Sequence, residues 1–90
     1  MLNVIYNEKF IRDLKSLKGS PSFLKIKNLC FSELPEKSQL SDISNLKKMQ
    51  GYSGYYRIRI GDYRLGLKIK ENTIEVMRVL HRKDIYQYFP

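Results

Sequence analysis

The sequence predicts a single α+β domain over residues 1–90, in which an N-terminal strand and an antiparallel helix pair precede a C-terminal antiparallel β-meander packed on the helices. Three observations predict this fold. The length of 90 residues suffices for one hydrophobic core but not for two. The composition, 42% hydrophobic and 29% charged, is typical of a globular protein. Apolar residues recur at helical spacing in the first third of the chain and alternate with other residues from Tyr55 onward, which indicates helices followed by strands.

The N-terminal part is predicted to form one strand and two helices. Residues 2–6 are apolar and partly β-branched, as in a strand, and Asn7 is a suitable N-cap for the helix that follows. This helix is expected to stop at Gly19, and a second one to begin at Ser20 and end at Pro35. Helices with such a short link form an antiparallel pair. The residues that share their apolar faces are Phe10, Ile11, Leu14, Leu17, Phe23, Ile26, Leu29, Cys30 and Leu34.

Residues 36–54 are predicted to be a polar connection. Their apolar periodicity is weak, which allows a turn of helix, and the stretch 50–54 with its two glycines is expected to be flexible. Lys47 and Lys48 lie in this connection. Such a lysine pair is usually plain solvated surface, but beside a basic site it is also a candidate contact to phosphate.

The C-terminal part is predicted to be a three-stranded meander. Residues 55–60 and 63–69 alternate along each stretch, and a Gly-Asp turn at residues 61–62 joins them. A second turn at residues 71–72 leads into a third strand over residues 73–80. One face of the sheet is therefore apolar and suited to pack on the helices, while the other face is basic.

The basic face is predicted to carry an arginine patch. The first turn puts Arg59 opposite Arg64, with Arg57 one step further along the same face. Like charges directly across a strand pair destabilise a sheet, so the arrangement favours a bound anion. The alternative is a plain solvated face, on which arginine stems cover the sheet and the charges repel little in salt water.

The third strand is expected to add a histidine to this patch. Pairing through the second turn puts Val79 opposite Arg64 and brings His81, the single histidine of the chain, onto the arginine face. Histidine transfers protons near neutral pH, although an ordinary surface histidine is the alternative. By the same alternation Arg78 falls on the apolar face, which indicates either a β-bulge or a position at an open edge of the sheet.

Charge and cysteine content narrow the class of protein. The net charge of +8, from 17 Lys and Arg against 9 Asp and Glu, favours polyanionic partners: nucleic acid, an anionic membrane or an acidic protein. Cys30 is alone and is expected to be a small buried hydrophobe, which fits a reducing compartment. The N-terminus resembles no signal peptide and no apolar run is long enough to span a membrane, so we expect a cytoplasmic protein with no membrane contact.

The predicted group of arginines with a histidine on one face of the sheet supports nucleophilic displacement at phosphorus. A ribose 2′-hydroxyl attacks the adjacent phosphate, arginines neutralise the developing charge, and a base and an acid move the protons. The sequence has no metal-ligand spacing of His and Cys, no carboxylate cluster and no glycine-rich phosphate loop. We therefore expect neither a metal nor a cofactor.

The run YYRIRIGDYRL at residues 55–65, followed by LHRKDIY at residues 80–86, resembles the RelE/ParE superfamily of bacterial toxins, and its RelE-type members in particular. The resemblance extends to the element order, so it implies a RelE-like two-layer fold. It further implies a type II toxin, inhibited by a cognate antitoxin, that enters the ribosomal A site and cleaves messenger RNA there. By motif position the resemblance implies the candidate catalytic residues Arg57, Arg59, Arg64, His81, Arg82 and Tyr86, with His81 as the candidate proton donor. Basic and aromatic residues near this set are the candidate RNA contacts: Lys47, Lys48, Tyr55 and Lys83.

Within this resemblance the general base is left open, because arginine hardly ever loses its proton. Two alternatives also stay open for the function. One is a ParE-type toxin that poisons DNA gyrase and is no nuclease. The other is an RNA-binding or ribosome-associated module without catalysis, in which tyrosines stack on bases and arginines hold phosphates.

Overall fold

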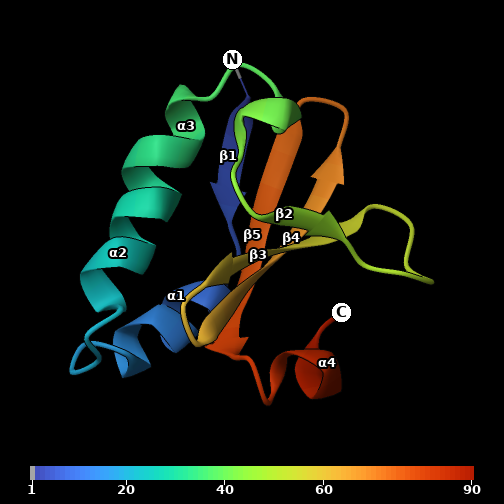
Figure 1. Ribbon diagram of the computed structural model, residues 1–90. Coiled ribbons are helices and arrows are strands. Elements are labelled where there is room, and N and C mark those ends of the chain that lie inside the picture. The colour runs from blue at the N-terminus through green and yellow to red at the C-terminus, as the bar shows by residue number, and fades with distance from the viewer. Residues whose placement is uncertain (1) are drawn as a thin grey trace.

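A five-stranded sheet forms the centre of the molecule in the computed structural model, which describes residues 2–90 (Figure 1). The elements in chain order are β1 (Asn3–Tyr6), α1 (Glu8–Ser16), α2 (Phe23–Asn28), a π-helical turn (Leu29–Glu33), α3 (Leu34–Glu36), a 3-10 turn (Leu40–Asp42), β2 (Leu46–Lys48), β3 (Tyr55–Ile60), β4 (Tyr63–Lys70), β5 (Thr73–His81) and α4 (Ile85–Tyr88). The strand order is β1-β5-β4-β3-β2, with β1 parallel to β5 and the other pairs antiparallel. The predicted α+β fold is confirmed.

The sheet has an inner face, packed against α1 and α2, and an outer face, on which α4 lies. Leucine, isoleucine and valine side chains from β3, β4 and β5 join those of the helices in one continuous core on the inner face. Cys30 is part of this core, and burial raises the pKa of its thiol to about 12, as expected of an inert cysteine. No helix within residues 2–90 is both long and apolar enough to cross a membrane.

Two helical segments form where they were predicted, with two differences at the boundaries of the second. Asn7 caps α1 by accepting a hydrogen bond from the backbone of Lys9 at 2.9 Å. The second helix begins at Phe23 instead of Ser20, and it continues through Pro35 to Glu36. Because proline has no N–H and its ring crowds the preceding turn, the wider π-helical turn before it accommodates the ring and keeps the helix from breaking.

Residues 36–54 contain a strand that the sequence interpretation missed. β2 pairs with β3 along the sheet's edge and puts Lys47 opposite Arg57. It is three residues long and two of them are exposed lysines, so neither apolar alternation nor β-branched residues mark it. The supposed connection therefore supplies one wall of the basic face.

The β3–β4 hairpin has the predicted register, with Arg59 opposite Arg64 and Ile60 opposite Tyr63. The register of β5 differs from the prediction, because Met77 forms a β-bulge and shifts every later residue by one position. Leu80 therefore stands opposite Arg64, and the expected pairing of Val79 with Arg64 was wrong.

Arg78 fulfils both alternatives that the sequence left open, since it follows the bulge and lies at an open edge of the sheet. β1 ends at Tyr6, so the last part of β5 has no strand beside it on that side. Asp13 of α1 takes the missing place: its carboxylate accepts hydrogen bonds from Arg78 Nε at 2.7 Å, Arg78 Nη2 at 3.1 Å and the backbone N–H of Val79 at 3.1 Å. The hydrogen bond to Asp13 raises the pKa of Arg78.

Candidate functional site

Three arginines converge on the outer face of the sheet. Arg57 and Arg59 project from β3, and Arg64 projects from β4 directly across from Arg59. Together with Lys47 of β2 and Asn45, they line a depression of about 210 Å³, which we call the arginine hollow. The predicted patch is therefore confirmed in its position, and β2 extends it by a fourth cation.

The charges in the arginine hollow act on one another. The pKa of Arg64 is lowered, first by its partial burial and then by the nearby charges of Arg57 and Arg59. Within residues 2–90 the salt bridges that form engage Arg12, Arg78 and Arg82, and none engages the three arginines of the hollow. Arg64 Nη1 instead donates to the carbonyl oxygens of Gly61 at 2.8 Å and Tyr63 at 3.0 Å. A cationic depression without internal compensation suits an anion with several oxygens.

The C-terminal segment places two more predicted residues near Arg64. Arg82 and Tyr86 both act on the charge of Arg64, Arg82 lowering its pKa further and Tyr86 opposing the shift. The guanidinium carbon of Arg57 lies 6.0 Å from the ring centroid of Tyr86, a distance compatible with a cation–π contact. Arg82 also reaches back to Asp62 at 3.6 Å, an exposed pair of little energetic weight.

A second, smaller apolar cluster holds this segment on the outer face. Its buried members are Met49, Ile85 and Phe89, and the half-buried Tyr55, Met77 and Leu80 pack around them. We call this set the C-terminal cluster. Phe89 packs so closely on Gly66 that a Cβ there would lie 2.8 Å from the ring. The position of Tyr86 therefore depends on a contact that only glycine permits.

His81 does not lie on the arginine face, so its expected placement was wrong. The Met77 bulge puts it in the row of Ile60 and Tyr63, whose side chains belong to the inner face. Its ring lies edge-on to Tyr63 with centroids 5.6 Å apart, and its Nδ1 accepts a hydrogen bond from the backbone of Lys83 at 3.2 Å. A single inserted residue thus moves the histidine from one side of the sheet to the other.

Of the four predicted RNA contacts, two border depressions on the outer face and two do not. Lys47 and Lys48 border depressions on the outer face. Tyr55 packs edge-on against Phe89, with ring centroids 5.7 Å apart, so it supports the C-terminal cluster rather than standing free for a base. Lys83 is exposed and borders neither of the depressions that Lys47 and Lys48 line.

Two further depressions were not predicted from the sequence. One adjoins the arginine hollow, has a volume of about 380 Å³ and is called the tyrosine hollow here; it is lined by Lys47, Lys48, Met49, Gln50, Tyr52, Arg57 and Tyr86. Gln50 and Tyr52 in this hollow, and Asn45 in the arginine hollow, are site residues that the sequence interpretation missed. The two glycines that flank Tyr52 were the available signal, since they mark a shaped loop as readily as a flexible one.

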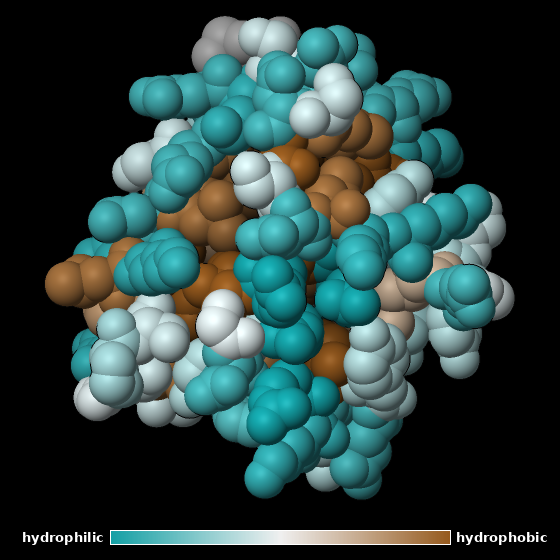
Figure 2. Space-filling model, in the orientation of Figure 1, coloured by the Kyte–Doolittle hydropathy of each residue, from teal (hydrophilic) through white to brown (hydrophobic). Residues whose placement is uncertain are grey.

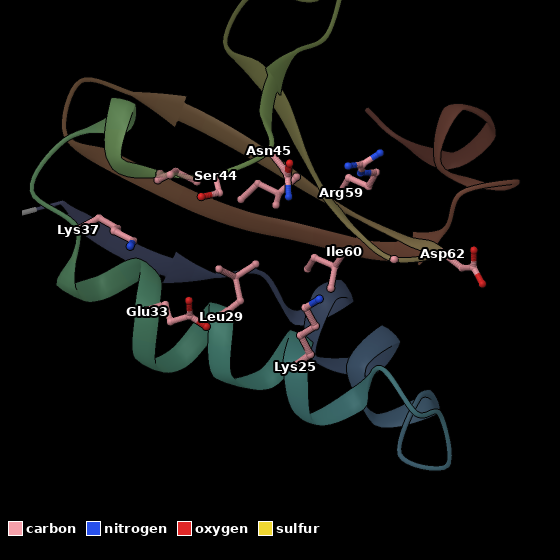
Figure 3. A pocket seen from close by; sticks show the side chains of 12 residues that line it. Lys25, Leu29, Glu33, Lys37, Ser44, Asn45, Arg59, Ile60 and Asp62 are labelled. Carbon is pink, nitrogen blue, oxygen red and sulfur yellow. The ribbon is translucent and has the colours of Figure 1, made fainter.

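The other depression lies on the opposite side of β3, between the helical segment and the end of that strand. This helix groove has a volume of about 550 Å³ and is lined by apolar side chains, among them Leu29, Ile58 and Ile60, and by charged ones, among them Lys25 and Glu33 (Figure 3). Figure 2 shows hydrophobic surface between the helix at the left and the central strands. β2 begins with Leu46 opposite Ile58, so the residues of β3 after Ile58 have no strand beside them on this edge. No group of three or more His, Cys, Asp or Glu within residues 2–90 is arranged to hold a metal ion.

Comparison with known proteins gives consistent similarities. A family model described as the ParE toxin of the type II toxin–antitoxin system parDE matches residues 4–86. Toxin RelE3 of Methanocaldococcus jannaschii is 41% identical over 90 residues, covering 99% of this chain and 100% of that protein. The toxin structure from the RelB–RelE antitoxin–toxin complex of Methanococcus jannaschii aligns with a TM-score of 0.77 at 40% identity, over 96% of this chain and 99% of the other. A chain of the E. coli DinJ–YafQ complex shares the fold, with a TM-score of 0.73 at 18% identity over 96% and 99% of the two chains.

Proposed function

The chain belongs to the ParE toxin family of type II toxin–antitoxin systems and is a RelE-type toxin, and from this premise we propose that it is an endoribonuclease that cleaves messenger RNA in the ribosomal A site. One observation carries the proposal: the uncompensated arginine hollow, with Arg82 and Tyr86 held beside it by the C-terminal cluster. Like charges held across one strand pair destabilise the sheet, which favours a site for a phosphate over an incidental surface.

The proposed reaction is attack of a ribose 2′-hydroxyl on the adjacent phosphate. A base takes the proton of the 2′-hydroxyl as the bond from the 2′-oxygen to phosphorus forms, and an acid gives a proton to the 5′-oxygen as its bond to phosphorus breaks. The products are a 2′,3′-cyclic phosphate and a free 5′-hydroxyl. Arg57, Arg59 and Arg64 would hold the phosphate and stabilise the charge that grows on its oxygens. Because arginine stays protonated, the arginines of the hollow serve as charge stabilisers, and proton transfer falls to other groups.

The proposed partner is a cognate antitoxin, and the proposed compartment is the cytoplasm, where ribosomes translate. The helix groove offers apolar floor and a free strand edge to a partner segment, while the arginine hollow offers charge to its carboxylates. The solved relative at 40% identity is described as part of an antitoxin–toxin complex, which supports this partner. Copurification with a small protein whose binding segment has no excess of acidic residues would contradict the electrostatic part of the proposal.

Purified ribosomes that carry a defined messenger provide the test of the activity. We expect the chain to cut the messenger at the A-site codon, and to leave the same RNA intact when ribosomes are omitted. The matching family model is that of the ParE toxin, so inhibition of DNA gyrase is the alternative activity to test. Supercoiling of plasmid DNA by gyrase is measured in parallel for this purpose. Inhibited supercoiling with intact messenger would favour the gyrase poison, and ribosome binding without cleavage would favour the non-catalytic module.

A further inference from the structure

The tyrosine hollow is continuous with the arginine hollow, because Lys47 and Arg57 border both. The arginine hollow is thus lined almost wholly by cations, whereas the tyrosine hollow adds two tyrosines, a methionine and a glutamine to its three cations, Lys47, Lys48 and Arg57. A nucleotide has the same two parts, an anionic phosphate and an uncharged planar base, joined through a sugar. The adjacency of the two depressions therefore matches the two ends of one nucleotide.

The walls of the tyrosine hollow have the chemistry that a nucleobase requires. Tyr52 and Tyr86 border it while remaining 53% and 64% exposed, so their rings have surface available for stacking. Met49, only 5% exposed, provides an apolar, polarisable floor. The Gln50 amide is a neutral group that can both donate and accept a hydrogen bond. Single-stranded RNA is recognised by this combination of aromatic stacking and hydrogen bonds to base edges.

The loop that carries Tyr52 and Gln50 is shaped in advance of any ligand. Gly51 and Gly54, with φ of 82° and 83°, adopt left-handed conformations that side-chain-bearing residues rarely take. The backbone N–H of Tyr52 donates to Met49 at 3.4 Å, and the carbonyl of Tyr52 accepts from Tyr55 at 3.2 Å. The carbonyl of Gly54 is fixed by the N–H of Ile69 in β4 at 2.8 Å. An exposed tyrosine held in such a frame is positioned for a ligand at little entropic cost.

We propose that the tyrosine hollow is a nucleobase subsite, in which Tyr52 stacks on the base whose own phosphate lies in the arginine hollow and Gln50 hydrogen-bonds to the edge of that base. The inference rests on the proposed RNA-cleaving function and names the residues that give it sequence preference. Stacking by Tyr52 acts on every base, since all bases have a π-face. Gln50 discriminates among bases, because the edges differ in donors and acceptors.

The test uses the full chain, ribosomes programmed with a messenger that carries a 2′-deoxy sugar at the cleavage position, and competition binding. Tyr52→Ala is expected to weaken binding by about 5- to 150-fold, the range for loss of one stacked base. Tyr52→Phe keeps the ring and is expected to bind like the parent. Tyr88→Ala is the matched control, because Tyr88 is similarly exposed on α4 but borders neither hollow.

Two substrate changes separate stacking from a structural effect. The first change removes the base from the nucleotide whose phosphate is proposed to lie in the arginine hollow. This abasic messenger is expected to bind the parent protein as weakly as the intact messenger binds Tyr52→Ala. The parent and Tyr52→Ala should then bind it equally well. The second change varies only this base in messengers that carry the normal 2′-hydroxyl and can be cleaved. Gln50→Ala is expected to cleave the four messengers at more similar rates than the parent does. A loop that merely supported the fold would not produce an effect that depends on which base is present.

Each outcome bears on a different claim. If the parent cleaves the messenger while Tyr52→Ala binds no worse than Tyr88→Ala, the subsite is wrong and the nuclease function stands. If the parent neither binds programmed ribosomes nor cleaves the messenger, the proposed function fails and the subsite with it. If Tyr52→Ala weakens binding of a purified antitoxin but leaves RNA binding intact, the hollow is a protein-binding site and the subsite is overturned.

Discussion

On the inner face of the sheet the side chains are apolar and almost fully buried, whereas the outer face combines like-charged arginines with the small C-terminal cluster. Arg64 and Leu65 are neighbours in β4 and illustrate the contrast, since one borders the arginine hollow and the other is completely buried. The inner face gains stability from every residue it buries. The outer face gives up stability by holding repelling charges together. We infer that the fold depends on the first face and the activity on the second.

The largest expected effect on stability is that of a truncation on the inner face. Leu65→Ala is predicted to lower the free energy of unfolding by about 2–5 kcal/mol, because it leaves a cavity in a fully buried position. Urea denaturation followed by circular dichroism measures the change. Cleavage per folded molecule should stay near the parental rate. A stable Leu65→Ala with lost cleavage would reverse the roles that we assign to the two faces.

A smaller effect is expected where α1 closes the open edge of β5. Asp13→Ala removes the carboxylate that binds the Arg78 side chain and the Val79 N–H, so a loss of about 2–3 kcal/mol in unfolding free energy is predicted. Glu8→Ala on the same helix breaks only the exposed pair with Arg12, and its melting curve should stay close to that of the parent. Equal melting of both variants would show that the Asp13 contacts do not stabilise the sheet edge.

The C-terminal cluster links the two faces, and Gly66→Ala tests that link. The added methyl group would overlap with the Phe89 ring, so we predict a loss of about 1–3 kcal/mol from overpacking. Displacement of the segment should also reduce cleavage, because Tyr86 moves with it. Combining Gly66→Ala with Phe89→Leu relieves the overlap and is expected to restore part of the activity. Unchanged proton spectra for the Phe89 ring in Gly66→Ala would speak against the contact.

The smallest effect is predicted for His81→Gln. The bulge at Met77 removes His81 from the arginine face. Loss of a group that transfers a proton in the reaction slows it at least about 10²-fold, and we expect a much smaller fall in the cleavage rate here. Initial rates on programmed ribosomes between pH 6 and 8, roughly the range in which histidine titrates, measure this. A loss of 10²-fold or more, with a flattened pH profile, would restore His81 as the proton donor.

The sequence predicted those parts that depend on local patterns. Alternation and the Gly61-Asp62 turn determine the Arg59–Arg64 pairing, and both are visible in the residues themselves. The bulge at Met77 has no such signal, because any of several residues in an apolar strand can be the extra one. The wrong prediction for the position of His81 follows from that single inserted residue.

The parts that the sequence interpretation missed are stabilised by contacts between distant segments. β2 and α4 are three and four residues long, too short for a periodic pattern, and each is held by residues elsewhere in the chain. β2 forms on the edge of β3, and α4 rests on Met49 and the strands of the outer face. The tyrosine hollow arises where these two elements meet, so its residues had no shared motif to reveal them.

The contrast between the two faces is tested most directly by Arg64→Ala, with cleavage and melting measured on the same preparation. Cleavage on purified ribosomes is predicted to fall about 10²–10³-fold, as for other stabilisers of transition-state charge. The melting temperature should equal that of the parent or slightly exceed it, because a repelling charge is removed from the sheet. Arg12→Ala, which removes an exposed arginine on α1, is the control and should leave both quantities unchanged. An Arg64→Ala protein that melts like the parent and still cuts at the parental rate would contradict the assignment of the activity to the arginine hollow.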